Sequence, residues 1–319
     1  MRSFACPTCS HLVFFENFSC LNCGTELGFA RVDRDMVAVG ALVRCANTQV
    51  ADCNWVVAPG EGLCGSCVLT RTRPADDDAA GMMSFVRAEA AKRRLVYQLD
   101  GLGLSTAGVL FDLLSSTNGP VITGHEDGVV TIDMAEGDDG HREALRVQLA
   151  EPYRTLLGHF RHETGHYYWT VLVEPDPDAF RALFGDERAD YAEALQKHYA
   201  GTPAPGWEES YVSTYATAHP WEDWAESFAH YLHIRDTLQT AASYGLVVGG
   251  PDAVTTPDAP LEATPTEDPS GFSEIERTWL PLTYALNAVN RSMGKDDLYP
   301  FYLSETVLKK LRFVHNLVT

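Results

Sequence analysis

The chain has 319 residues, 45% of them hydrophobic and 10% aromatic, so it is long enough to bury one substantial core and a smaller second one. Its formal net charge of −20 opposes binding to nucleic acid, since such binding needs Lys and Arg to displace counterions from phosphates. No run approaches the roughly 18 consecutive apolar residues of a membrane span, and no charged and apolar leader opens the chain. We therefore expect a cytoplasmic protein that binds neither nucleic acid nor membrane.

All eight cysteines lie between residues 6 and 67, which marks the N-terminal part of the chain as a metal-binding domain. Two CxxC turns come first, and two single cysteines and a third CxxC turn follow. Each CxxC turn presents two thiolates to one metal, and four thiolates close the tetrahedral shell of a structural zinc ion. We expect two structural zinc ions, the first bound by Cys6, Cys9, Cys20 and Cys23 and the second by Cys45, Cys53, Cys64 and Cys67.

Disulfides and iron are the alternatives to zinc for these thiols. Disulfides need an oxidising compartment, and the sequence shows no export signal. Iron in a rubredoxin-like site of four cysteines stays open, because tetrahedral thiolates accept either metal. Residues 1–73 hold six Arg and six acidic residues, so metal-bound thiolates would make this domain negative and unsuited to nucleic acid.

A polar, acidic stretch at residues 74–81 is expected to link two domains. The cysteine-rich domain covers residues 1–73, and the second domain covers residues 82–319. Within the second domain, residues 249–271 hold five prolines, five acidic residues and several threonines. This composition buries too little apolar surface to order itself, so we expect a flexible surface loop there.

Hydrophobic periodicity predicts mainly helices in the second domain, with one short strand region. Helical spacing runs through residues 85–99, 151–173 and 274–318. The β-branched run at residues 129–132 follows a turn rich in Gly and Pro and is typical of a strand or a hairpin. The fold class that follows is α+β.

The helix expected at residues 151–173 carries the sequence His162-Glu163-Thr164-Gly165-His166. In this HExxH pattern two histidines one helical turn apart face one metal, and the glutamate beside them activates a water. The alternative is an incidental pair of histidines on a surface helix, so the context must decide. His159 shares the same helix face, and it either contacts the substrate or a neighbour or serves as a hydrogen-bonded structural histidine.

A second expected helix offers acidic residues that suit a metal centre. Glu222, Glu226 and His230 follow one another at spacings of four, so they share one helix face. A zinc peptidase needs a third protein ligand, and a further carboxylate fixes the tautomer of a histidine ligand. Glu222 and Glu226 can divide these two roles. The tryptophans that flank Glu222 and Asp223 argue against a merely solvated charged face.

The chain resembles bacterial zinc-binding metallopeptidases that carry an N-terminal zinc ribbon, and the resemblance covers nearly its whole length. Three segments carry it: Cys6 to Gly24, the run Glu151-Pro152-Tyr153-Arg154-Thr155-Leu156-Leu157-Gly158-His159-Phe160-Arg161, and Asn290-Arg291-Ser292-Met293-Gly294. The resemblance implies a zincin-like metallopeptidase domain, mainly helical with a small sheet, behind a zinc ribbon or rubredoxin-like domain. It also implies that the strand near residues 129–133 borders the cleft and could hold an extended peptide by strand addition.

A more distant resemblance assigns the roles of the acidic residues. The segment from Tyr215 to Phe228 is similar to the corresponding helix of anthrax lethal factor and related glutamate-zincins. In those proteins the metal-binding glutamate begins a Glu-x-x-Ala-Glu run, and a tyrosine precedes it by seven residues. The resemblance implies that Glu222 is the third zinc ligand and Glu226 the carboxylate that supports the ligands. Tyr215 then becomes a catalytic residue, with an ordinary packing tyrosine as the alternative.

Together these patterns predict zinc-dependent hydrolysis of a peptide bond, with one catalytic zinc held by His162, His166 and Glu222 and with Glu163 as general base. The expected partner is a peptide or protein substrate, and the zinc ribbon offers a surface for a protein partner. Two alternatives stay open. One is an adaptor whose zincin domain is weakly active or inactive, and the other is hydrolysis of a non-peptide amide by the same chemistry.

Overall fold

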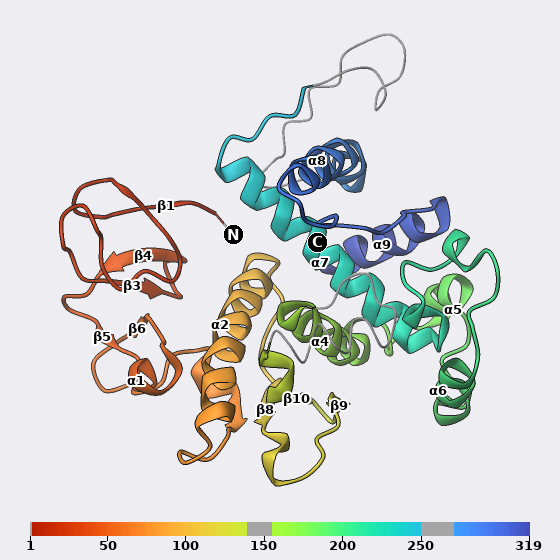
Figure 1. The fold of residues 1–319 in the computed structure, drawn as a ribbon, viewed down its shortest axis with the longest axis horizontal. Helices are drawn as coiled ribbons and strands as arrows, with labels where there is room; N and C mark the ends of the chain where they lie inside the picture. Colours follow the sequence, from red (N-terminus) through yellow and green to blue (C-terminus); the bar gives the residue numbers. More distant parts are fainter. Residues whose placement is uncertain (1, 139–154, 250–270) are drawn as a thin grey trace. The chain divides into compact units, whose positions relative to one another are not determined.

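The computed structural model describes three stretches of the chain: residues 2–138, 155–249 and 271–319. They form two compact units, and the chain passes from the first to the second between Thr164 and Gly165, inside the helix α4 (Leu156–Leu172) (Figure 1). The loop expected at residues 249–271 lies outside the described residues, apart from the residue at each of its ends.

Short strands build the cysteine-rich part of the first unit. Its elements in chain order are β1 (Phe4–Ala5), β2 (Leu12–Val13), β3 (Leu27–Ala30), β4 (Asp35–Ala38), β5 (Val43–Arg44), α1 (Thr48–Ala51), β6 (Trp55–Val57) and the 3-10 helix η1 (Cys67–Leu69). β1 pairs antiparallel with β2, and a four-stranded sheet has the order β4, β3, β6, β5. These strands are too short to bury a large core by themselves.

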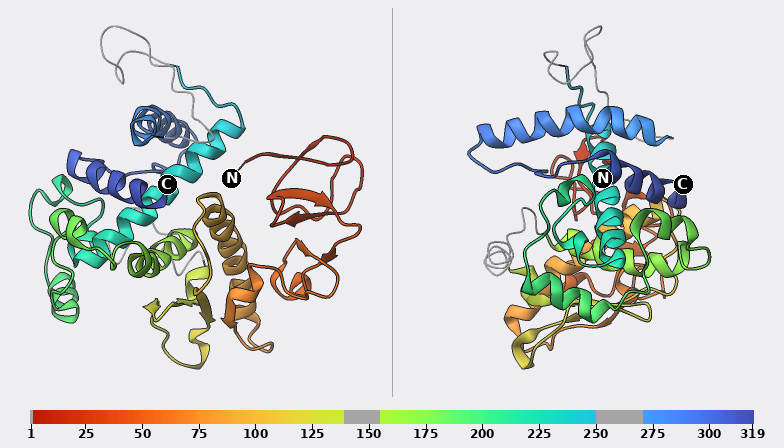
Figure 2. Two further views of the ribbon diagram at one scale, coloured as in Figure 1. Left: turned by 180° about the vertical axis from the view of Figure 1, so that it is seen from behind. Right: turned by 90° about the vertical axis from the view of Figure 1, so that its right-hand side faces the viewer.

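An aromatic core joins the cysteine-rich part to the long helix α2 (Ala79–Gly101). The rings of Phe29 and Trp55 lie 4.9 Å apart, and the ring of Phe15 lies 5.3 Å from that of Tyr97 on α2. Figures 1 and 2 show α2 beside the cysteine-rich segment. The helix thus completes a core that the small strands could not close.

α2 is the first helix that the sequence predicts, and it confirms the periodicity of residues 85–99. It begins at Ala79 because Asp78 caps it, accepting a hydrogen bond of 2.8 Å from the amide of Gly81. The residues expected as a linker therefore include the first turn of this helix.

The second sheet of the first unit confirms the expected strand or hairpin. Its strands are β7 (Thr70–Thr72), β8 (Leu110–Leu114), β9 (Gly124–Glu126) and β10 (Val129–Asp133), and the 3-10 helices η2 (Ser116–Asn118) and η3 (Met134–Gly137) lie next to them in the chain. β9 and β10 form an antiparallel hairpin, which turns at Asp127 and Gly128 with φ of 48° and 79°. Positive φ at both positions is what a two-residue hairpin turn of type I′ requires.

The expectation that the strand near residues 129–133 takes an extended peptide by strand addition is wrong. The sheet has the order β7, β8, β10, β9, so β10 is an inner strand. It pairs parallel with β8 on one side and, over residues 129–131, antiparallel with β9 on the other, so it offers no open strand edge to a peptide there. The sheet instead supports α4, since the rings of Phe111 on β8 and Phe160 on α4 lie 5.5 Å apart.

The second unit is helical in the residues that the structure describes. Besides the end of α4 it contains α5 (Asp178–Phe184), α6 (Tyr191–Ala200), η4 (Trp207–Glu209), η5 (Tyr215–Thr217), α7 (Pro220–Ser243), α8 (Phe272–Ser292) and α9 (Glu305–Val318). α8 and α9 both pack against α7 (Figures 1 and 2). The tail from residue 274 is therefore helical, as its periodicity predicts.

A cysteine-rich segment followed by a mainly helical chain with a small sheet confirms the predicted α+β fold class. Among the described helices, none has the length and apolar character that crossing a membrane requires.

Candidate functional site

Three groups of side chains in the described residues bring their donor atoms within 4.8 Å of one another. The groups are Cys6, Cys9, Cys20 and Cys23; Cys45, Cys53, Cys64 and Cys67; and His162, His166 and Glu222. They coincide with the three ligand sets that the sequence predicts. Residues far apart in the chain thus converge in each group.

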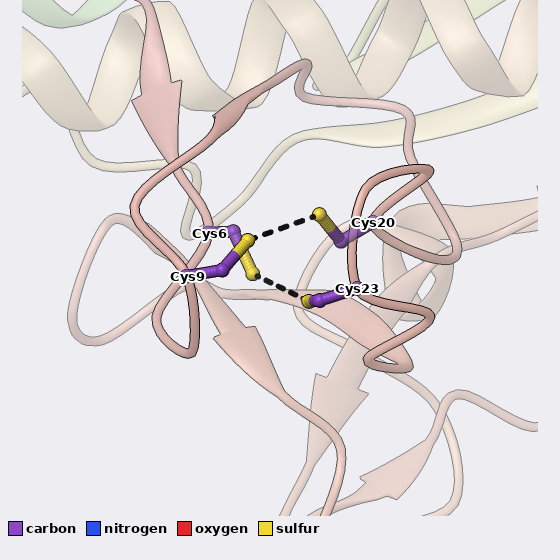
Figure 3. A group of neighbouring side chains, drawn as sticks. All are labelled: Cys6, Cys9, Cys20 and Cys23. Carbon is purple, nitrogen blue, oxygen red and sulfur yellow. Dashed lines mark hydrogen bonds between the residues drawn. The ribbon is translucent and has the colours of Figure 1, made fainter.

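The first cysteine group has the geometry of a metal site (Figure 3). The sulfurs of Cys6 and Cys23 lie 3.7 Å apart, as do those of Cys9 and Cys20. A tetrahedron with Zn–S bonds of about 2.3 Å has sulfurs about 3.8 Å apart, whereas disulfide sulfurs lie about 2.05 Å apart. These four cysteines are therefore free thiols spaced for one tetrahedral ion.

The second cysteine group is fully buried and has the same spacing. The sulfurs of Cys53 and Cys64 lie 3.7 Å apart. The amide of Cys64 donates to the sulfur of Cys45 at 3.2 Å, and the amide of Cys67 donates to the sulfur of Cys64 at 3.4 Å. Such N–H donors stabilise thiolates, and thiolates are the form that binds a metal.

A buried ion pair on α2 lies against this second group, and the sequence did not reveal it. Glu89 Oε2 lies 3.7 Å from the sulfur of Cys67, and Lys92 Nζ donates to Glu89 Oε1 at 2.6 Å. Both charged side chains are fully buried. Glu89 and Lys92 are three residues apart on a helix, a spacing more often found on an exposed face, so only the fold shows that they are part of the interior.

Helix α4 holds the two histidines one turn apart, and Gly165 between them lets α7 approach closely. A Cβ added to Gly165 would lie 3.1 Å from the Cα of Ala225 on α7. The indole nitrogen of Trp224 also donates to the carbonyl oxygen of Gly165 at 2.7 Å. This contact between the two helices brings Glu222 to the histidines.

The two oxygens of the Glu222 carboxylate contact different neighbours. Its Oε2 lies 3.6 Å from Nε2 of His166, and its Oε1 accepts a hydrogen bond of 2.5 Å from the hydroxyl of Tyr191. The side chain is only 1% exposed, while that of His166 is 16% exposed. Oε2 thus faces His166, and Tyr191 binds Oε1. The sequence did not single out Tyr191, because it lies 31 residues before Glu222 and belongs to no motif.

Glu226 lies one helical turn after Glu222 and accepts a hydrogen bond of 2.6 Å from the hydroxyl of Ser213. Between them in the chain, Asp223 is paired with Lys310 of α9 at 2.5 Å, and both side chains are buried. Burial raises the pKa of Asp223 to about 7, and the neighbouring Lys310 opposes this shift. Lys310 also donates to the carbonyl oxygen of Ser210 at 2.6 Å, so α9 anchors the segment that carries Ser213.

Two further residues that the sequence singled out have identified neighbours. Tyr215 lies in η5, with its ring 5.8 Å from that of His198 on α6. His159 lies near a buried carboxylate, with its Nδ1 3.6 Å from Oε2 of Glu136. These contacts place His159 beside the buried Glu136 and Tyr215 against α6, the helix that also supplies Tyr191.

Comparison with protein families agrees with the groups of possible zinc ligands described above. Residues 81–317 match the model of the family described as "Putative zinc-binding metallo-peptidase". The chain belongs to this family. Residues 3–78 match the model of a zinc-ribbon domain. The two cysteine groups lie within the zinc-ribbon match, and the histidines and Glu222 lie within the metallo-peptidase match.

Relatives of this metallo-peptidase family member occur in mycobacteria. Two uncharacterized proteins, from Mycobacterium bovis and Mycobacterium tuberculosis, are each 52% identical to it over 337 residues. The match covers 100% of this chain and 95% of each relative. No solved structure matches the chain.

Proposed function

We propose that this protein hydrolyses peptide bonds with a catalytic zinc ion held by His162, His166 and Glu222. The observation that carries the proposal is the convergence of two imidazoles and one carboxylate oxygen within 4.8 Å. Two His nitrogens and one carboxylate oxygen form a donor set found in zinc peptidases, which leave the fourth position open. When bound, zinc would supply a Lewis acid that polarises the carbonyl and lowers the pKa of a water.

The protein's own residues would transfer the proton and position the zinc ligands. Glu163 follows His162 directly on α4 and is 9% exposed. We assign it as the general base that takes the proton of the attacking water and passes it to the leaving amine. Tyr191 would hold Glu222, and Glu226 would support the ligands from the next turn. The likeness to glutamate-zincins supports Tyr215 as a second catalytic residue.

The proposal extends to the cysteine groups, which we assign to two structural zinc ions. The family matches at residues 3–78 and 81–317 support a division near residues 74–81. We also propose that the zinc ribbon binds a protein partner and that the protein acts in the cytoplasm, where thiols stay reduced.

Counting zinc by native mass spectrometry tests the proposal together with a cleavage assay. The purified chain should carry three zinc ions, and it should cleave peptides in a mixture, with activity lost to a chelator and restored by zinc. Three zinc ions without cleavage of any peptide would overturn the peptidase and favour a non-peptide amide or an adaptor. Two zinc ions would favour the adaptor, and fewer would overturn the metal assignment of the cysteines.

Replacing Cys6 by Ser should remove one zinc ion per chain and loosen the aromatic core around Phe15, because metal binding supplies folding energy to such domains. Native mass spectrometry would report the zinc count, and the NMR signals of the N-terminal domain would report the packing of its core. Ser19→Ala is the control, since Ser19 is exposed next to Cys20. An unchanged zinc count in Cys6→Ser would contradict the assignment of this site.

Replacing Tyr191 by Phe should weaken zinc binding at the catalytic site about 10- to 100-fold, the usual effect of losing a partner of a metal ligand. The change removes only the hydroxyl that donates to Glu222. A chelator titration followed by native mass spectrometry would measure it. Tyr199→Phe is the matched control, because Tyr199 lies on the same helix with 63% of its side chain exposed. Equal zinc affinity in Tyr191→Phe and the wild type would show that this bond does not hold Glu222.

A further inference from the structure

A cavity of about 670 Å³ lies in the second unit between α6 and the segment of residues 202–211. One face of α6 lines it, with Asp190, Glu193, Ala194, Lys197 and His198 at the spacing of successive helical turns. No residue of α6 is fully buried. The inward face of this amphipathic helix therefore borders an open space instead of a packed core.

The charged groups in the cavity wall already have partners within the protein. Lys197 pairs with Glu193 at 2.7 Å, and Asp190 accepts the amide of Glu193 as the cap of α6 at 2.9 Å. Burial lowers the pKa of His198, which favours the neutral imidazole. The wall therefore keeps one net negative charge, that of Asp190, whose carboxylate already accepts the amide of Glu193.

Aromatic and apolar groups form much of the remaining wall. Trp207 and Tyr211 line it, together with Pro203 and Pro205 of the connecting segment. Cavities of about 300–1,000 Å³ with apolar walls and a few polar groups are typical of binding sites. Aromatic rings in such a wall pack well against another aromatic ring.

Helix α6 connects the cavity wall to Glu222 of the proposed catalytic centre. α6 begins at Tyr191, whose hydroxyl donates to Glu222, and continues to His198 in the cavity wall. The negative charge of Glu222 acts on His198 and opposes the lowering of its pKa by burial. Thr217, another wall residue, contacts Nδ1 of His198 at 3.4 Å and belongs to the 3-10 helix of Tyr215.

We propose that this cavity receives a large uncharged side chain of the substrate, aromatic by preference, from a residue close to the cleaved bond. The proposal rests on the peptidase function proposed above and names the class of substrate that it would choose. Ala194, the small residue of α6 that lines the cavity, and Trp207, an aromatic residue of its wall, are the positions that test it.

Ala194→Trp tests this proposal by filling the cavity. The zinc-loaded protein is incubated with a mixture of peptides, and the cleaved bonds are mapped by mass spectrometry. The wild type should prefer Phe, Tyr or Trp over Ala at one position beside the cleaved bond. The preference is measured as kcat/KM for a peptide with the aromatic residue divided by kcat/KM for its alanine counterpart. Ala194→Trp should reduce this ratio at least about 10-fold, the scale on which pocket shape discriminates side chains. Ala192→Trp is the matched control, because Ala192 is exposed on the outer face of α6.

Trp207→Ala provides a second variant that adds no bulk, and it should lower the same ratio. Circular dichroism and the zinc count should match the wild type in all variants. An unchanged preference in both variants, with cleavage intact, would overturn the cavity proposal and leave the peptidase function standing.

A binding measurement separates the two proposals if no peptide is cleaved. Isothermal titration of the zinc-loaded wild type with an aromatic peptide and its alanine counterpart is then the readout. Binding of the aromatic peptide that Ala194→Trp abolishes would support the cavity and overturn the peptidase. Absence of binding would overturn both.

Discussion

Glu163→Gln is expected to lower the rate of peptide hydrolysis about 10²- to 10⁴-fold while leaving the zinc content unchanged. The amide of Gln has the size of the carboxylate but cannot accept the proton of the attacking water, and positioned general bases contribute rate factors of this order. Glu163 itself is not in the group of donor atoms formed by His162, His166 and Glu222, so its replacement should not remove the metal.

Two measurements check this expectation: kcat/KM on a peptide that the wild type cleaves, and the zinc count by native mass spectrometry. Glu174→Gln is the control, because Glu174 is exposed just after the end of α4. A Glu163→Gln protein that retains most of its activity would show that another group takes the proton. Loss of zinc together with activity would instead indicate that Glu163 holds the metal.

The features that local spacing determines could be predicted from the sequence. CxxC turns and HExxH place their ligands within one turn of the chain, so the residue pattern already contains the geometry. The helix α2 and the hairpin of β9 and β10 likewise follow from short-range periodicity and turn chemistry. The fold class followed from these elements.

The features that depend on contacts between distant segments could not be predicted. Tyr191 reaches Glu222 across 31 residues, and Lys310 reaches Asp223 across 87. No periodicity in the sequence connects such pairs, since only the packing of α6 and α9 against α7 brings them together. The inner position of β10 was missed for the same reason. A strand pattern shows where a strand lies, but strand order depends on the connections of the whole sheet.

The different roles proposed for Glu222 and Glu226 give the other large expected effect. Glu222→Ala should strip the catalytic zinc at moderate chelator concentration, because it removes one of three protein ligands whose donor atoms lie within 4.8 Å. Glu226→Ala should weaken zinc binding only about 10- to 100-fold, as expected for a residue that supports ligands. Its carboxylate is held by Ser213 at 2.6 Å, and one helical turn separates it from Glu222.

Helix geometry makes equal roles for the two carboxylates unfavourable. A residue four positions further along a helix rises about 6 Å, whereas zinc binds carboxylate oxygen at about 2.0–2.2 Å, so both could not reach one ion without distorting α7. Chelator titrations of both variants, followed by native mass spectrometry, would compare them. Glu208→Ala is the control, since Glu208 is exposed in η4. Complete loss of the catalytic zinc in Glu226→Ala, with Glu222→Ala still retaining it, would reverse the two assignments.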